Sequence, residues 1–245
     1  MSEYINLTKD TIKRLIKDIK YLNKNPLHDN GIYYSHDSED MLKGYALIIG
    51  PSDTPYFGGY YFFDFSYPPD YPHTPPIVTY CTNGENIRFN PNLYTSGKVC
   101  ISLLNTWRGE QWTSCQTIST ILLTLCSLLN DTPLLNEPGI TEKHNDYDKY
   151  NTIINYKNYD IAILQNIQNI LNENIHFDAR FRIFEEPMIE SLKKNKNKIM
   201  KHLEHQKKNI KSQNISTGLY SMHVRINYTE LYNNFSKLFK QMKIK

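Results

Sequence analysis

Residues 90–104 read N-P-N-L-Y-T-S-G-K-V-C-I-S-L-L, a stretch that joins a turn, a thiol and a short apolar run. Cys100 follows Asn92 by eight residues, and an asparagine amide is a donor of the kind that holds an oxyanion when a thiol attacks or leaves a carbonyl. Ser96 and Gly97 form a turn signal before the apolar run at 99–104. We therefore expect Cys100 at the edge of ordered structure, backed by core but reachable from solvent.

Two simpler interpretations of this stretch stay open on spacing alone. Free cysteine is among the most buried residue types and usually packs in a core. Asn-Pro-Asn by itself is an ordinary turn. The segments on either side of the stretch shift the balance toward chemistry.

Three further motifs flank this stretch. Upstream, residues 55–76 read P-Y-F-G-G-Y-Y-F-F-D-F-S-Y-P-P-D-Y-P-H-T-P-P. Downstream, residues 112–129 read W-T-S-C-Q-T-I-S-T-I-L-L-T-L-C-S-L-L, and residues 136–139 read N-E-P-G. In this order and spacing the segments resemble the catalytic domain of ubiquitin-conjugating enzymes, and the resemblance covers roughly residues 10–140.

Details of these motifs resemble one branch of that family, the large conjugating enzymes. The N-P-N form, the insert N-T-W-R-G-E-Q-W at residues 105–112 and N-E-P-G are similar to the Z-type enzyme and to the catalytic domain of the giant baculovirus-repeat apoptosis inhibitor. A weaker resemblance continues over residues 147–205. Trp107 and Trp112 bracket the insert, and we expect both to pack over the active site because tryptophans seldom sit fully exposed.

The resemblance implies an α+β chain with the UBC fold: an N-terminal helix, a four-stranded antiparallel sheet, C-terminal helices and an added helical C-terminal extension. Local patterns agree with this order. Apolar spacing predicts a first helix, capped by Thr8 and ended by Asn25-Pro26, and a later helix capped by Ser114. Strands are predicted at residues 44–49, 61–67 and 77–80, the second with the alternation of a half-buried strand.

Three regions are expected along the chain: a catalytic core at residues 1–140, a helical extension at 141–205 and a basic tail at 206–245. The extension is predicted to hold one long helix over 147–175 and another over 185–205. The tail contains a basic amphipathic helix, which can dock on its own domain, bind a partner or lie on an anionic membrane. Docking is the favoured interpretation of the three.

The net charge of +3 hides an asymmetry between the two ends of the chain. Residues 193–245 carry 13 lysines and arginines against 2 acidic residues, so the remainder has a net charge of −8. A solvated and mobile basic tail is the simplest interpretation. Binding of nucleic acid or an anionic surface through the tail is an alternative function, but its few aromatic residues sit at helical spacing, which suits packing better than base stacking.

Composition favours a protein with a real core, since 40% of its residues are apolar. No run approaches the roughly 18 apolar residues that a membrane span needs, and the polar N-terminus lacks the apolar segment of a signal peptide. The four cysteines form no C-x-x-C pair and no histidine stands at zinc-finger spacing, so we expect reduced thiols and neither a metal site nor a cofactor. These features predict a cytoplasmic or nuclear protein without a membrane partner.

The resemblance also implies a reaction. Cys100 would accept the C-terminal glycine of ubiquitin, or of a ubiquitin-like modifier, as a thioester from an activating enzyme and pass it to an amine or a ligase. Asn92 is assigned to stabilising the oxyanion or holding the active-site loop. Glu137 is the acid expected beside the acceptor lysine, with its neighbour Asn136 as the alternative. Asn90 stands where the family motif usually begins with histidine, and its role stays open.

Two other classes of protein are weighed against this reaction. No histidine lies close to Cys100 in sequence, and a free thiol with a pKa of about 8.5 is only a few per cent thiolate at neutral pH. That fraction suffices for exchange with an activated thioester but serves amide hydrolysis poorly, which argues against a cysteine protease. A catalytically silent, ubiquitin-binding member of the fold is the other alternative, although such variants typically lack the cysteine.

The resemblance assigns two partner surfaces as well. Lys13, Arg14 and Lys17 on the first helix match the family's docking face for the activating enzyme, although a solvated helix face would look the same. His73 and Ser114 stand where ligase RING domains grip an aromatic residue and a proline in the family. Because both anchors are altered here, recruitment of an ordinary RING ligase is in doubt.

Overall fold

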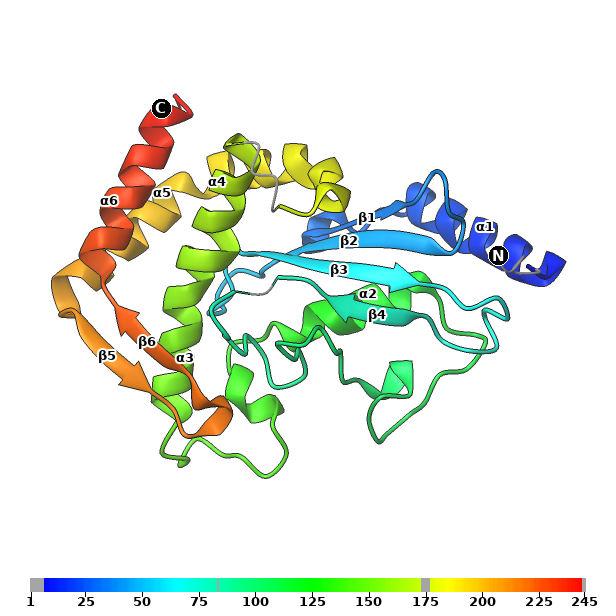
Figure 1. Ribbon diagram of the computed structural model, residues 1–245, viewed down its shortest axis with the longest axis horizontal. Coiled ribbons are helices and arrows are strands. Elements are labelled where there is room, and N and C mark those ends of the chain that lie inside the picture. The colour runs from blue at the N-terminus through cyan, green and yellow to red at the C-terminus, as the bar shows by residue number, and fades with distance from the viewer. Residues whose placement is uncertain (1–6, 83, 173–176, 244–245) are drawn as a thin grey trace, which may run out of the picture.

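A four-stranded antiparallel sheet lies at the centre of the computed structural model, which describes residues 7–82, 84–172 and 177–243 (Figure 1). Its strands run in the order β1 (Ile32–His36), β2 (Lys43–Ile49), β3 (Tyr60–Ser66) and β4 (Ile77–Tyr80). The α+β class and the four-stranded sheet are thus confirmed. Strand β1 is the one that local patterns do not locate, because I-Y-Y-S-H lacks alternation and most of its residues are only partly buried.

Two helices of the core begin at threonine caps. Helix α1 (Lys9–Lys24) starts where the Thr8 hydroxyl accepts the Thr11 N–H at 3.1 Å, as predicted. Helix α2 (Ile118–Leu128) is capped by Thr117, whose hydroxyl accepts the Thr120 N–H at 3.3 Å. The predicted cap at Ser114 is therefore wrong, because residues 113–116 first close a separate turn.

The extension begins as one helical rod with an irregular middle (Figure 1). It consists of α3 (Tyr147–Lys157), a π-helical segment (Asn158–Gln165) and α4 (Asn166–Leu171). Asn158 is fully buried, accepts the Tyr61 hydroxyl at 2.7 Å and donates to the Phe57 carbonyl at 3.0 Å. The predicted long helix is confirmed through Leu171, and the last residues predicted for it, 173–175, lie outside the described residues.

A second part of the extension covers the face of the sheet that the sequence analysis left to solvent. The 3-10 segment η5 (Ala179–Phe184) leads into α5 (Glu185–Asn209). Phe181 stacks on Phe62 with ring centroids 4.7 Å apart, and Arg180 pairs with Asp64. Strand β3 is consequently buried on both faces, so the prediction of a half-buried strand is wrong.

The basic tail is ordered and packs on the rest of the chain. A hairpin of β5 (Gln213–Ser216) and β6 (His223–Ile226), which the sequence analysis does not predict, precedes α6 (Tyr228–Gln241). Helix α6 lies along α5 and the π-helical segment (Figure 1), and it buries the apolar residues Leu231, Phe235, Leu238 and Phe239. Docking is therefore confirmed for the tail helix, and the interpretation as a solvated, mobile tail is wrong over residues 206–243.

The buried apolar residues of the described chain, from Leu15 to Phe239, form one hydrophobic cluster. The expected boundaries at residues 140 and 205 therefore do not separate independent cores. Within residues 7–243, apart from the short undescribed gaps, every helix is too short or too polar to cross a membrane.

Candidate active site

A small hairpin at residues 92–100 carries Cys100 at the edge of the sheet. The Cys100 N–H donates to the Asn92 carbonyl at 2.9 Å, and the Tyr94 N–H donates to the Lys98 carbonyl at 2.9 Å. Gly97 turns the hairpin with a φ of +90°, a left-handed conformation that glycine adopts without strain. Its carbonyl accepts the Tyr80 N–H at 2.8 Å, which fastens the hairpin to β4.

Asn92 and Cys100 lie together, as the sequence analysis requires. The Asn92 side-chain amide donates to the backbone carbonyl of Cys100 at 2.6 Å. Its own backbone N–H donates to the Asn90 side chain at 2.9 Å. In this state the amide holds the hairpin closed, and its action on an oxyanion stays a prediction.

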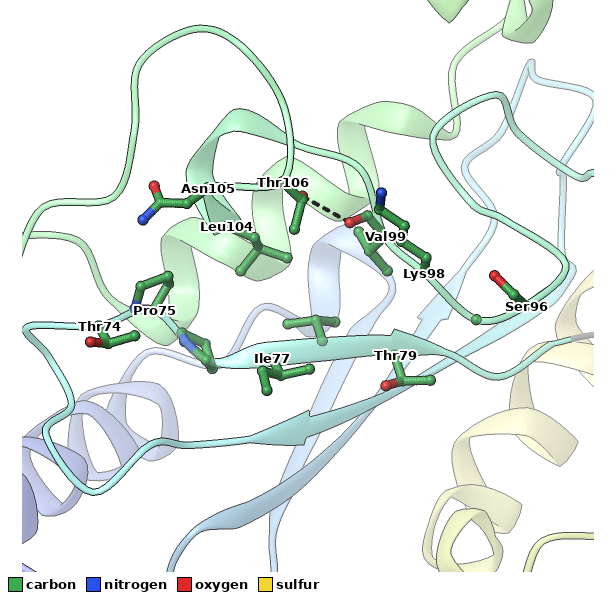
Figure 2. Close-up of a pocket in the computed structure, with 13 residues that line it drawn as sticks. Thr74, Pro75, Ile77, Thr79, Ser96, Lys98, Val99, Leu104, Asn105 and Thr106 are labelled. Atoms are coloured by element: carbon green, nitrogen blue, oxygen red, sulfur yellow. Dashed lines mark hydrogen bonds between the residues drawn. The ribbon is translucent and has the colours of Figure 1, made fainter.

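Cys100 is only 3% exposed, so the expectation that it is reachable from solvent is wrong for this conformation. Its thiol donates to the Thr106 carbonyl at 3.1 Å. The Thr106 hydroxyl also lies 2.9 Å from the Val99 carbonyl and accepts the Ile101 N–H at 3.0 Å (Figure 2). The start of the 105–112 insert thus folds back onto the arm of the hairpin that carries the sulfur, a short-range contact that the sequence analysis did not predict.

A cavity of about 540 Å³ opens beside the arm of the hairpin that leads to Cys100. Figure 2 shows Ile77 and Thr79 of β4 along one side, with Lys98, Val99 and Thr106 along the other. Ile77 is 70% exposed, so an apolar side chain stands in the open there. Val99, directly before Cys100, and Thr106, which bonds its thiol, both line the cavity, but Cys100 itself does not.

Asn90 is a structural centre of the site whose role the sequence analysis left open. It is fully buried, and its amide donates to the Leu128 carbonyl at 2.8 Å and to the Tyr56 hydroxyl at 3.1 Å. Its side-chain oxygen accepts a hydrogen bond from the Asn92 backbone N–H and another, at 3.4 Å, from the Asn136 side-chain amide. Three asparagines, at positions 90, 92 and 136, therefore connect the segment before Glu137 to the Cys100 hairpin. Their repetition beside the candidate site residues is the feature of the sequence that could have indicated this network.

Glu137 follows the 3-10 segment η3 (Pro133–Asn136) and is half-buried. Its carboxylate accepts a hydrogen bond from the Tyr220 hydroxyl, which belongs to the tip of the β5–β6 hairpin. The structure thus brings the predicted acid beside a residue 83 positions away in the sequence. No pattern in the sequence indicates this contact.

The other cysteines differ in their surroundings. Burial raises the pKa of Cys81 to about 12 and also raises the pKa of Cys126. Cys115 is exposed. Among the described residues, no group of three or more histidine, cysteine, aspartate and glutamate side chains is arranged to hold a metal ion.

Comparison with known proteins gives evidence of common ancestry, which is independent of this geometry. A family model described as ubiquitin-conjugating enzyme matches residues 14–158. The chain belongs to the ubiquitin-conjugating enzyme family. The match contains the Cys100 hairpin, Asn90 and Glu137, and it ends at the start of the π-helical segment.

Three relatives show how far the similarity to family members extends. Ubiquitin-conjugating enzyme E2 Z of Danio rerio is 42% identical over 159 residues, which are 64% of this chain and 48% of that protein. The dual E2 ubiquitin-conjugating enzyme/E3 ubiquitin-protein ligase BIRC6 of Homo sapiens is 50% identical over 107 residues, 41% of this chain and 2% of that protein. The solved structure of human ubiquitin-conjugating enzyme E2 G1 covers 49% of this chain and 94% of its own, with 32% identity and a TM-score of 0.43.

The resemblance to the Z-type enzyme and to the giant inhibitor is confirmed by these matches. This chain spans about half the length of the Z-type relatives. The residues after the family match, from about 159 onward, include α4, α5, the β5–β6 hairpin and α6.

The three residues predicted to dock the activating enzyme differ in their surroundings. Lys13 and Lys17 are exposed on α1. Arg14 bonds the Asp18 carboxylate at 3.0 Å and donates to the carbonyls of Ser114 and Gln116. Arg14 thus joins α1 to the loop before α2, whereas Lys13 and Lys17 stay exposed.

The two predicted ligase anchors lie on loops that Trp112 joins. His73 and Ser114 are both exposed. The Trp112 indole N–H donates to the Pro72 carbonyl at 2.7 Å, and Trp112 is 8% exposed. Trp107 is 44% exposed, so the expectation that both tryptophans are packed is wrong for this one.

Proposed function

We propose that this chain is an active ubiquitin-conjugating enzyme whose Cys100 carries ubiquitin or a ubiquitin-like modifier as a thioester. The observation that supports this most directly is the pairing of the thiol with an amide donor on one hairpin, where the Asn92 amide lies 2.6 Å from the Cys100 carbonyl oxygen. Membership of the family supports the reaction class.

Loading of Cys100 is a thiol exchange in which one carbon–sulfur bond forms as another breaks. The Cys100 thiolate attacks the thioester carbonyl that joins the modifier to the activating enzyme, and the activating enzyme's thiolate leaves. The hydrogen bond from the Cys100 thiol to the Thr106 carbonyl disappears in this step, because a thioester sulfur carries no proton. Thr106 must therefore release the sulfur for the modifier to be loaded.

The Asn92 amide can serve both the hairpin and the reaction, because it carries two N–H donors. One of them holds the Cys100 carbonyl. The second is available to the oxyanion of the tetrahedral intermediate, where a donor of this kind is worth about 3 kcal/mol.

Transfer to lysine is an aminolysis in which the amine nitrogen forms a bond to the carbonyl carbon and the Cys100 thiolate leaves. The attacking ammonium must first lose a proton, and a carboxylate beside it can orient the ammonium and receive that proton. We assign this role to the half-buried Glu137. The amide of its neighbour Asn136 is engaged by Asn90 and the Leu128 carbonyl, which makes Asn136 the weaker candidate.

The proposed reaction implies three partners: the modifier, an activating enzyme and a ligase. We assign Lys13 and Lys17 to the activating enzyme because both are exposed on α1. We assign His73 and Ser114 to ligase contact, since both stand exposed on the joined loops. Because a sulfur that forms thioesters must stay reduced, we propose the cytoplasm or the nucleus as the compartment.

Intact mass after incubation with an activating enzyme, ATP and ubiquitin tests the proposal. We expect an adduct of one ubiquitin that a thiol reductant removes. Cys100→Ala should form no such adduct, whereas Cys115→Ala, which removes an exposed thiol, should match the wild type. Cys100→Ser should hold ubiquitin as an oxyester that resists the reductant.

Two results would contradict the proposal. One is a wild-type protein that forms no reducible adduct with ubiquitin or with any ubiquitin-like modifier supplied with its own activating enzyme. The other is an adduct that persists in Cys100→Ala, because the thioester would then sit on a different residue.

A further inference from the structure

The tip of the β5–β6 hairpin, residues 217–222, lies against the loop that carries Glu137 (Figure 1). There the Tyr220 hydroxyl donates to Oε2 of Glu137, and Oε1 is left to meet an incoming group. Burial, and then the neighbouring Glu137, raise the pKa of Tyr220. The hydroxyl therefore keeps its proton at neutral pH and remains a donor to the carboxylate.

The backbone of this tip is held in an unusual conformation. Tyr220 has a φ of +61° and Ser221 a φ of +48°, in the left-handed region that non-glycine residues rarely adopt. The buried Asp146 carboxylate accepts the N–H groups of Gly218 and Leu219 at 3.0 and 2.9 Å and so anchors the tip to the start of α3. Strained residues of this kind persist where the surrounding structure over-determines them, and they cluster at functional sites.

Tyr220 is also connected to the other loop of the site. The Arg88 guanidinium lies 5.0 Å from the centre of the Tyr220 ring. The same guanidinium donates to the carbonyls of Asn90 at 3.2 Å and Pro91 at 2.6 Å, directly before Asn92. Tyr220 therefore contacts the Glu137 loop directly and the Asn90 loop through one arginine.

We propose that Tyr220 is a positioning residue for transfer to lysine: its hydroxyl holds the Glu137 carboxylate in the orientation that receives the acceptor ammonium. The C-terminal hairpin, which lies outside the family match at residues 14–158, then completes the acceptor site. This inference rests on the proposed function, and within it on the role of Glu137.

The variant Tyr220→Phe tests the inference because it removes only the hydroxyl. Tyr94→Phe is the matched control, since the Tyr94 ring lies 3.4 Å from the same Arg88 guanidinium but its hydroxyl does not bond Glu137. Each protein is charged with ubiquitin, ATP is removed, and discharge is followed with free lysine and with hydroxylamine, an amine that is uncharged at neutral pH.

We expect Tyr220→Phe to charge like the wild type and to discharge to lysine about tenfold more slowly, the effect of losing one hydrogen bond to a charged group. Discharge to hydroxylamine should be unchanged, because that amine has no proton to give up before attack. The deficit with lysine should narrow as the pH rises toward the lysine pKa of about 10.4. In a Glu137→Gln background, Tyr220→Phe should slow discharge no further.

Three outcomes would overturn the inference. Equal losses with lysine and hydroxylamine would mean that the hydroxyl only maintains structure. Unchanged or faster discharge to lysine would mean that it does not help Glu137. A wild type that charges but never discharges to lysine would remove this inference and leave the thioester activity standing, whereas a wild type that does not charge would remove both.

Discussion

The Asn92 side-chain amide holds the Cys100 hairpin, and we propose that the same nitrogen also serves the reaction. Its amide nitrogen donates one proton to the Cys100 carbonyl at 2.6 Å and has a second proton to offer. The geometry around it is not adjustable, because its own backbone N–H is bonded to the fully buried Asn90. A donor fixed in this way needs no reorganisation when an oxyanion forms.

Replacing Asn92 with alanine should therefore affect both stability and rate. We expect a loss of about 1–3 kcal/mol of unfolding free energy, from the unsatisfied Cys100 carbonyl. We also expect discharge to lysine to slow by about a hundredfold or more, from the missing oxyanion donor. Urea unfolding and single-turnover discharge measure the two effects, with the exposed Thr95→Ala on the same hairpin as control. A destabilised variant with a normal rate would restrict Asn92 to its structural role.

Asn90 should matter chiefly for stability. Asn90→Ala leaves the Asn92 N–H without its partner in the interior, a loss worth about 1–3 kcal/mol, and the Leu128 carbonyl keeps only its hydrogen bond from the Asn136 amide. We expect the midpoint of urea unfolding to fall, and the Cys100 thiol to react faster with a small alkylating agent because its hairpin loosens. An Asn90→Ala protein with wild-type stability would show that water replaces these hydrogen bonds.

The element that most alters the sheet is η5, since it converts an exposed face into an interior one. Phe181 is 2% exposed and lies on Phe62, while Ile183 on the same segment is 51% exposed. The contact also brings Arg180 to Asp64, a carboxylate on β3 that would otherwise face solvent. The side chains of β3 do alternate between the two faces of the sheet. The face that we predicted to be exposed is covered by residues more than a hundred positions later in the chain.

Phe181→Ala should destabilise the protein by about 3–5 kcal/mol, the range for emptying a buried phenylalanine site. Ile183→Ala, a truncation on the same segment but on its exposed side, should stay within about 0.5 kcal/mol of the wild type. Thermal and urea unfolding of the two variants provide the comparison. Similar small effects at both positions would mean that η5 rests on the sheet without being part of its core.

At the scale of the whole molecule, the extension and the catalytic core share one interior, since their buried apolar residues form a single cluster. Elements of the extension also meet one another. His202 of α5 stacks on Tyr159 of the π-helical segment, with ring centroids 4.8 Å apart, and its Nε2 lies 3.1 Å from the Asn155 side chain. Burial, and then the nearby His205, lower the pKa of His202, and burial also lowers the pKa of His36 beside β2. Both histidines therefore take up a proton at a lower pH in the folded protein than in the unfolded chain.

These two histidines predict how stability depends on pH. Their ordinary pKa is 6.5, so as the pH falls below that value the unfolded chain binds protons that the folded chain resists. The free energy of unfolding should therefore decrease between about pH 6.5 and pH 5, with one cooperative transition. His202→Gln should reduce the slope, because one of the two groups no longer titrates. A flat profile, or an unchanged slope in the variant, would contradict the assignment.

Much of the fold and part of the site follow from the sequence alone, because they depend on local spacing. Helical periodicity located α1, α2 and α6, and a short-range motif brought Cys100 and Asn92 forward as candidates, whereas Glu137 came from the resemblance to ubiquitin-conjugating enzymes. Asn92 and Cys100 are only eight residues apart, so a single hairpin turn at Gly97 suffices to pair them. Contacts between residues this close in the chain can be predicted from the sequence.

Only the tertiary structure decided what covers the reactive residues. Thr106 screens the Cys100 sulfur, η5 closes the outer face of the sheet, and Tyr220 reaches Glu137 from 83 residues away. The contacts of η5 and Tyr220 join segments far apart in the chain whose own patterns say nothing about each other, since the energy that forms them comes from burying surfaces of one shared core. Thr106 is only six residues from Cys100, but the turn that brings it onto the sulfur has no signal in the sequence. The sequence determined which groups can react, and long-range packing determined which of them are covered, held or left free.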